Sequence, residues 1–118
     1  MKIYRFDSEV GKSIDRYDSS GFTISRVVHL SGEAVVNCAY LEANGMIGYH
    51  QARVHQLFLV VQGEGWVRGA SADRTSIKAG QAAYWEEGEW HESSTETGMT
   101  AIIIEGMNFD PAKLMPPL

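Results

Sequence analysis

Apolar residues along this chain come in short alternating or unbroken runs, and each run ends at glycine, serine, aspartate or asparagine. Such a pattern is typical of β-strands, and no stretch carries the periodicity of a long helix. It predicts strands at residues 2–6, 22–30, 34–41, 56–61, 66–68, 75–78, 81–85, 90–94 and 99–105. A single helical turn is expected at 111–114, because Asp110 precedes Pro111 there.

Glycine-marked turns are expected to connect these strands. Ser31-Gly32-Glu33 is predicted to pair residues 22–30 with 34–41, and Gly63-Glu64-Gly65 to reverse the chain into a hairpin. Residues 42–48 are expected to form a loop leading to His50. A closed barrel leaves the fewest unpaired strand edges for this many short strands. The predicted fold class is therefore all-β, a two-sheet jelly roll.

Length and charge narrow the class of protein. With 118 residues the chain is expected to form one domain, because a single core serves chains of about 100–150 residues. A net charge of −5 and scattered basic residues argue against a nucleic-acid partner. No apolar run approaches the ~18 residues that span a membrane, and the amino terminus lacks a signal-like apolar segment, so a cytoplasmic location is expected. The single cysteine, Cys38, fits a small strand residue.

Two segments carry the chemistry that stands out, GMIGYHQARVHQLFLVVQG at 45–63 and GQAAYWEEGEWHESST at 80–95. They resemble the paired motifs of the cupin superfamily, G-x5-H-x-H-x3,4-E-x6-G and G-x5-P-x-G-x2-H-x3-N. The resemblance implies a small single-domain cupin of bacterial type, with a double-stranded β-helix (jelly-roll) barrel at about residues 22–106 and a C-terminal tail at 107–118.

The match to these motifs is incomplete at the positions that hold metal in cupins. His50 and His91 stand at histidine positions, but Ala52 replaces the second histidine and Gln56 the glutamate. The resemblance implies a divalent metal, Zn, Fe, Mn or Ni, at His50, Gln56 and His91, held weakly because an amide is a poor ligand. The alternative to a metal site is that both histidines are ordinary hydrogen-bonded residues. His55 is the less favoured ligand, since strand alternation turns it away from Gln56 unless the strand bulges.

Aromatic residues cluster in and beside the two motif segments. Pockets for small molecules are mostly apolar and aromatic with a few polar groups, so a ligand pocket is predicted around the histidines. Its expected aromatic members are Tyr49, Phe58, Tyr84 and Trp85, with Phe58 on the same strand face as Gln56. Trp90 is expected to face away from this pocket, and the alternative is that the aromatic residues only fill the core.

Three functions remain open on this sequence. The first is binding of a small organic ligand in the barrel cavity, with or without the weak metal; the others are a metal-dependent oxygenase or isomerase, and a metal-free sensing module. No general base is evident. A homodimer is expected, because dimers are the commonest closed assembly and apolar strand surface such as the segment around Ile103 would be covered.

Overall fold

The structure is a computed structural model that describes all residues 1–118. Ten strands and three single turns of 3-10 helix make up the fold. The strands are β1 (Lys2–Arg5), β2 (Lys12–Ile14), β3 (Phe22–Ile24), β4 (Ala34–Leu41), β5 (Met46–Gln51), β6 (His55–Arg68), β7 (Thr75–Lys78), β8 (Gln81–Trp85), β9 (Trp90–Ser94) and β10 (Met99–Gly106). The 3-10 turns are Ser8–Val10, Arg16–Asp18 and Pro111–Lys113, and no helix has the length and apolar character to cross a membrane.

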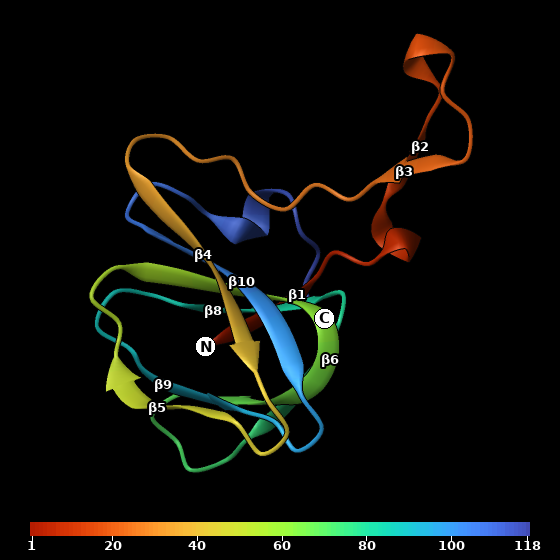
Figure 1. The fold of residues 1–118 in the computed structure, drawn as a ribbon. Coiled ribbons are helices and arrows are strands. Elements are labelled where there is room, and N and C mark those ends of the chain that lie inside the picture. The colour runs from red at the N-terminus through yellow and green to blue at the C-terminus, as the bar shows by residue number, and fades with distance from the viewer.

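The strands form a barrel of two antiparallel layers (Figure 1). One layer has the order β1-β8-β6-β10-β4, and the other contains β5, β9, β7 and the second half of β6. The all-β jelly-roll prediction is confirmed. The expected helical turn after Asp110 is also present, and the Asp110 carboxylate accepts a hydrogen bond from the Ala112 backbone N–H at 3.0 Å.

Strand β6 is longer than predicted, because the chain does not reverse at Gly63-Glu64-Gly65. Residues 56–61 and 66–68 belong to one continuous strand that passes from the first layer into the second. Gly63 has a φ of +80°, and a Cβ placed there would collide with the Gly98 carbonyl. The predicted hairpin is therefore wrong. Glycine is needed here for a bend and a close crossing of backbones, which the sequence pattern does not distinguish from a turn.

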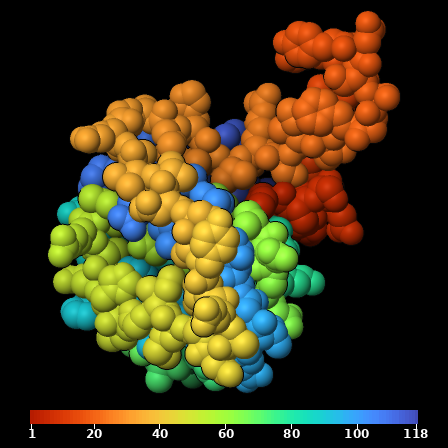
Figure 2. All heavy atoms as spheres, in the orientation of Figure 1, coloured from red at the N-terminus to blue at the C-terminus, as the bar shows by residue number.

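The predicted pairing of residues 22–30 with 34–41 is also wrong. Only Phe22–Ile24 is a strand, and it pairs with β2 in a separate two-stranded sheet that projects from the barrel (Figures 1 and 2). Strand β4 instead pairs with all eight residues of β10. The long apolar strand β10, which comes late in the chain, is therefore the partner of β4 in place of the neighbouring residues 22–30. The barrel consequently includes Lys2–Arg5 and leaves residues 22–24 outside.

The expected loop at 42–48 is only partly a loop. Strand β5 begins at Met46, so His50 lies on a strand and not in a loop, and β5 pairs with β9. Ile103, which was expected on a flat outer surface, lies on the central strand β10 and packs against the barrel interior. Ile102 and Ile104 of the same segment lie on the outer side of the sheet, so a partner surface around Ile103 stays a prediction that concerns these two neighbours and not Ile103 itself.

Two apolar clusters lie on opposite faces of the first layer. The inner cluster fills the barrel with Phe58, Val60, Val67, Ile77, Ala83, Trp85, Met99 and Ala101. The outer cluster consists of Tyr4, Leu57, Leu59, Ala82, Tyr84, Ile104 and Met115, and Val27, Val28 and Phe109 pack against it. Alternate residues of β6 thus enter different clusters, as the period of two requires. Gln56 has the parity of Phe58 and faces the barrel interior at its mouth.

Candidate functional site

His50 and His91 are brought together at the barrel mouth by the pairing of β5 with β9. The two residues are directly opposite each other in the register, and their ring centroids lie 4.3 Å apart with the planes tilted by 55°. His91 is 1% exposed, whereas His50 is exposed to solvent. One imidazole therefore lies at the floor of the mouth and the other at its rim.

Backbone carbonyls orient both imidazole rings. His50 Nδ1 lies 2.6 Å from the Gly48 carbonyl oxygen, and His91 Nδ1 lies 3.3 Å from the Glu89 carbonyl oxygen. A carbonyl only accepts hydrogen bonds, so in this arrangement each Nδ1 carries the hydrogen and each Nε2 presents a lone pair. His91 Nε2 is buried and has no hydrogen-bond partner in the chain. Because unpaired buried polar atoms are rare, this atom indicates a missing partner.

Trp85 forms the wall beside His91. Its ring stacks on the His91 imidazole with a centroid distance of 4.6 Å and an interplanar angle of 27°, and Phe58 packs edge-on at 6.3 Å. Trp85 is fully buried, and its Nε1 has no hydrogen-bond partner. The indole N–H is a donor only. Two adjacent rings therefore offer one unused acceptor and one unused donor.

A cavity of about 290 Å³ opens at the mouth. It is lined by His50, Gln51, Ala52, Arg53, Val54, Gln56 and Glu105. Glu105 lies directly opposite Gln56 in the β10–β6 register and therefore shares its inward face. Its carboxylate makes no ion pair or hydrogen bond within the chain. Glu105 is the site residue that was missed, although a carboxylate after the apolar run MTAIII was a signal for it.

Burial is the main electrostatic influence on His91. Desolvation lowers the pKa of His91, and the neighbouring His50 lowers it further, while the Glu89 backbone contact and carboxylate oppose this. His91 is consequently a neutral imidazole at neutral pH, which is the form that accepts a hydrogen bond or ligates a metal.

Three other candidate residues lie away from the pair. Tyr49 stacks on Trp90 at 5.2 Å under the Arg68 guanidinium, and Trp90 faces outward as expected. Tyr84 belongs to the outer cluster, where burial raises its pKa to about 12. His55 lies near Tyr84, and its Nδ1 accepts a hydrogen bond from the Glu87 backbone N–H at 3.0 Å. Of the predicted pocket residues, the structure brings only Trp85 next to the histidine pair, and Phe58 packs on Trp85.

The donors at the mouth do not fit a tightly held transition metal. No group of three or more histidine, cysteine, aspartate or glutamate side chains lies close enough to hold an ion. The pair supplies two imidazoles, and Gln56 adds only an amide, whereas stable sites use three or four strong donors. The free lone pair on His91 Nε2 is nevertheless compatible with a weakly held ion.

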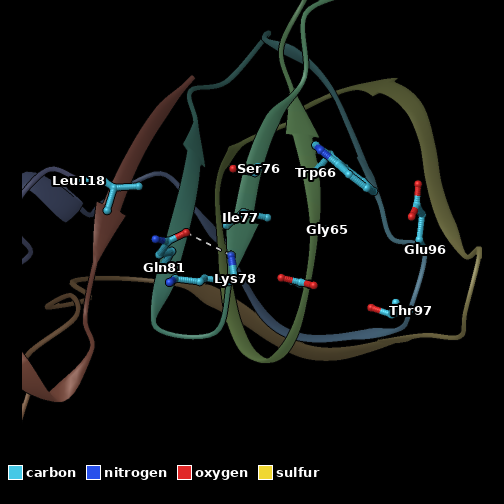
Figure 3. Close-up of a pocket in the computed structure, with 10 residues that line it drawn as sticks. Gly65, Trp66, Ser76, Ile77, Lys78, Gln81, Glu96, Thr97 and Leu118 are labelled. Atoms are coloured by element: carbon cyan, nitrogen blue, oxygen red, sulfur yellow. Dashed lines mark hydrogen bonds between the residues drawn. The ribbon is translucent and has the colours of Figure 1, made fainter.

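Three larger hollows lie elsewhere. One of about 380 Å³ lies at the C-terminal tail, is lined by His29, Ser31, Asn108, Phe109, Asp110 and Lys113, and holds no buried unpaired atom. The other two lie beside the β7–β8 turn. One of about 420 Å³ is lined by Glu64, Gly65, Trp66, Ser76, Ile77, Lys78, Gln81, Glu96, Thr97 and Leu118 (Figure 3). The second, of about 450 Å³, shares Lys78, Gln81 and Leu118 with it. Their polar side chains are mostly exposed, and neither hollow lies beside a buried unpaired atom, whereas the mouth cavity is lined by His50, whose ring contacts that of His91. The chemistry therefore points to the smaller cavity at the mouth.

Solved structures with a similar fold were found. A cupin superfamily protein from Desulfitobacterium hafniense is 10% identical with a TM-score of 0.60, covering 76% of this chain and 82% of that one. An RmlC-like cupin from Shewanella frigidimarina is 22% identical with a TM-score of 0.57, covering 69% and 68%. KdgF from a Halomonas species is 20% identical with a TM-score of 0.56, covering 73% and 77%. No family model and no curated protein matches the chain.

These likenesses define the class. The chain has the cupin fold, and the resemblance to small single-domain cupins is confirmed at that level. Sequence identities between 10% and 22% establish the fold and carry no information about function. The histidine pair, the cavity and their unused polar atoms are therefore the basis for any statement about function.

Proposed function

We propose that this cupin binds a small organic molecule at the barrel mouth, against His50 and His91. The observation that carries the proposal is the buried Nε2 of His91, which has a lone pair and no partner. Leaving such an atom unpaired costs about 1–3 kcal/mol, so its retention favours a ligand that donates a hydrogen bond to it. The adjacent cavity of about 290 Å³ has room for a small molecule only.

The cavity lining, together with the buried rings of His91 and Trp85 behind His50, indicates what the ligand presents. His91 Nε2 accepts, Trp85 Nε1 donates, and Glu105 adds a carboxylate at the opposite strand. A ligand that carries hydroxyl or amine donors fits the acceptors, and one carbonyl or hydroxyl oxygen fits the indole N–H. Gln56 both donates and accepts through its amide. Trp85 stacks on His91 and Phe58 packs on Trp85, so the buried side of the site is apolar.

A weakly held divalent metal, Zn, Fe, Mn or Ni, is the second candidate. It is favoured by the orientation of both imidazoles, because a hydrogen bond from Nδ1 to a carbonyl is the usual support of a histidine that ligates through Nε2. His50, Gln56 and His91 would hold such an ion, which would act there as a Lewis acid. A metal-dependent oxygenase or isomerase requires this candidate, whereas a metal-free sensing module requires only the organic ligand.

The proposal is tested by comparing wild type with His91→Ala. Untagged protein is analysed for bound Fe, Mn, Ni, Zn and Cu, and is then screened by thermal shift against each metal and against a library of small polyols and amino alcohols. We expect at least one ligand to raise the melting temperature of wild type and to have no effect on His91→Ala, because a ligand of the folded state stabilises it by mass action.

His55→Ala is the matched control, because His55 lies on the other face of β6 with Tyr84. It is expected to respond to ligands as wild type does. The site would lie elsewhere if His91→Ala kept the full response. Less than about a tenth of an equivalent of metal, with no shift on adding it, would exclude the metal candidate and leave the organic ligand.

We further propose that the protein is a homodimer with a cytoplasmic location. The barrel carries exposed apolar side chains that a partner subunit would cover, among them Val35, Val36 and Tyr40. The net charge of −5 continues to argue against a nucleic-acid partner. The location rests on sequence alone.

A further inference from the structure

The hairpin of β2 and β3 is an arm with one apolar face that is only partly covered. Register places Ile14 opposite Phe22 and Ser13 opposite Thr23, so Ile14, Phe22 and Ile24 share one face and the polar pair the other. Phe22 is 41% exposed and Ile24 is 40% exposed. A hairpin with three residue pairs is marginal in isolation, so its stability requires a surface to pack against.

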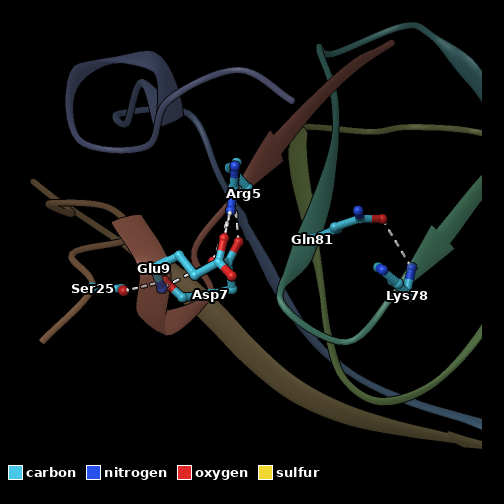
Figure 4. A network of polar contacts seen from close by, with 6 residues as sticks. All are labelled: Arg5, Asp7, Glu9, Ser25, Lys78 and Gln81. Atoms are coloured by element: carbon cyan, nitrogen blue, oxygen red, sulfur yellow. Dashed lines mark hydrogen bonds and ion pairs between the residues drawn. The ribbon is translucent and has the colours of Figure 1, made fainter. Parts of the chain in front are cut away.

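The base of this arm is fixed to the barrel (Figure 4). Arg5 donates two hydrogen bonds of 2.9 Å to the Asp7 carboxylate and a third of 3.2 Å to Glu9. Ser25 Oγ donates to the Asp7 carbonyl at 2.7 Å, and the Phe6 N–H donates to the Gly80 carbonyl. The strands that enter and leave the arm are thus joined to each other and to the β7–β8 turn.

The fixed base directs the arm away from its own barrel (Figures 1 and 2). The molecule is accordingly elongated, with extents of 47 × 33 × 22 Å. After the arm, Val27 and Val28 are anchored on the outer cluster. With both ends held in this way, the apolar face of the arm does not fold back onto its own sheet.

A matching uncovered surface lies on β4, at the edge of the first layer. Register with Ile102 and Ile104 places Cys38 and Val36 on the outer side of the sheet, and Tyr40 has the same parity. Val36 is 56% exposed and Tyr40 is 78% exposed, and β4 lies at the front surface in Figure 2. The strand AVVNCAYL contains no charge or proline, which are the usual protections of a free edge.

We propose that the arm of one subunit packs its apolar face, Ile14, Phe22 and Ile24, on the outer side of β4 of a second copy, at Val36, Cys38 and Tyr40. Twofold symmetry makes the contact reciprocal, so one dimer covers two arms and two β4 surfaces. Lys12 lies opposite Ile24 at one end of the apolar face, and Glu33 and Glu42 flank β4, so this lysine meets a carboxylate at either end of the strand. The mode of assembly rests on the homodimer proposed above and is independent of the ligand.

Sedimentation velocity over a concentration series tests the contact. Phe22→Asp is expected to raise the dimer dissociation constant at least about 100-fold, because each of two reciprocal contacts would bury an unpaired charge. Thr23→Asp, on the polar face of the same hairpin, is expected to stay dimeric. A monomeric wild type at micromolar concentration would overturn the proposal, and so would a Phe22→Asp variant as dimeric as Thr23→Asp.

Cross-linking through the native Cys38 identifies the surface that receives the arm. Ile24→Cys and Phe22→Cys, each treated with a short bis-maleimide, are expected to give a covalent dimer, whereas Thr23→Cys and wild type are not. A Cys38–Cys38 dimer in wild type would show instead that the two β4 edges pair directly. Cross-links within one chain would show that the arm folds back, and no cross-link in either variant would place the arm elsewhere; each result would contradict the proposal.

Failure of the arm contact is separable from failure of the ligand site. The thermal-shift screen is repeated on Phe22→Asp, in which the mouth residues His50, His91 and Glu105 are unchanged. If Phe22→Asp is monomeric and still responds to ligand, the result supports the arm contact and the ligand site as independent features. A loss of both dimer and ligand response with an intact fold would contradict the independence of the contact from the site.

Discussion

The two faces of the first layer are built on the same strands and differ in how completely they are closed. On the outer face, the tail packs Phe109 and Met115 over an apolar cluster that leaves no buried polar side-chain atom unpaired. On the inner face, the apolar cluster ends at His91 and Trp85, which carry the two buried unpaired side-chain atoms of the chain. The outer face is thus organised for stability, and the mouth of the inner face retains polar groups at a cost that packing alone does not explain.

The largest effect is expected for Leu57→Ala, which tests the outer face. Leu57 is fully buried, so the substitution should lower the free energy of unfolding by about 3 kcal/mol, through lost burial and the cavity left behind. Urea denaturation measures this. Ligand or metal response at the mouth should be unchanged, since the side chain points away from it.

Val61→Ala is the control on the same strand, because Val61 is 47% exposed. Its effect should stay within about 0.5 kcal/mol. The comparison of the two faces fails if Leu57→Ala abolishes ligand response in protein that remains folded.

An intermediate effect is expected for Gln56→Glu, which tests the mouth. The substitution supplies a carboxylate on the inward face next to the histidine pair, and should raise affinity for Zn²⁺ or Ni²⁺ by about 10–100-fold. Isothermal titration calorimetry on untagged protein measures it. Gln62→Glu, exposed further along β6, adds the same charge without a donor at the site and should leave affinity unchanged. Equal affinities in both variants would show that Gln56 does not face the pair.

The smallest effect is a dependence of stability on pH that originates in His91. Burial lowers its pKa in the folded protein below the usual value near 6.5, so the unfolded chain binds the proton more readily. Stability from this group is therefore complete above about pH 6.5 and decreases as the pH falls toward the folded-state pKa. Melting temperatures of wild type and His91→Gln, measured between about pH 7.5 and pH 5.5, should diverge. Parallel curves would contradict the assignment.

Strand alternation was enough to predict the parity of β6. Gln56 and Phe58 face inward and His55 faces outward because an extended strand turns each residue to the opposite side. The same rule separates Trp85 from Tyr84, although their shared place in the second motif segment predicts both in the pocket. Neighbouring residues of a strand point to opposite faces, so membership of the motif does not place Tyr84 in the pocket.

Contacts between distant segments were the part that the sequence did not reveal. Glu105 reaches the mouth only because β10 pairs with β6, and β4 is an edge strand only because it pairs with β10 instead of residues 22–30. The local sequence predicts a turn at Gly63, whereas the role of this residue depends on the Gly98 carbonyl, which approaches from a distant part of the chain. Such pairings depend on which surfaces meet in three dimensions, and local patterns carry no record of them.

The central position of β10 has a consequence for how the chain reaches its fold. Met99–Gly106 lies between β6 and β4, so the first layer cannot close until a segment near the carboxyl end has been synthesised. Strand β4 has no other partner and must wait for it through more than half of the chain. Loop closure over such separations is slow, so we expect refolding in the range of milliseconds to seconds. During that interval the uncharged β4 segment is the part most exposed to aggregation.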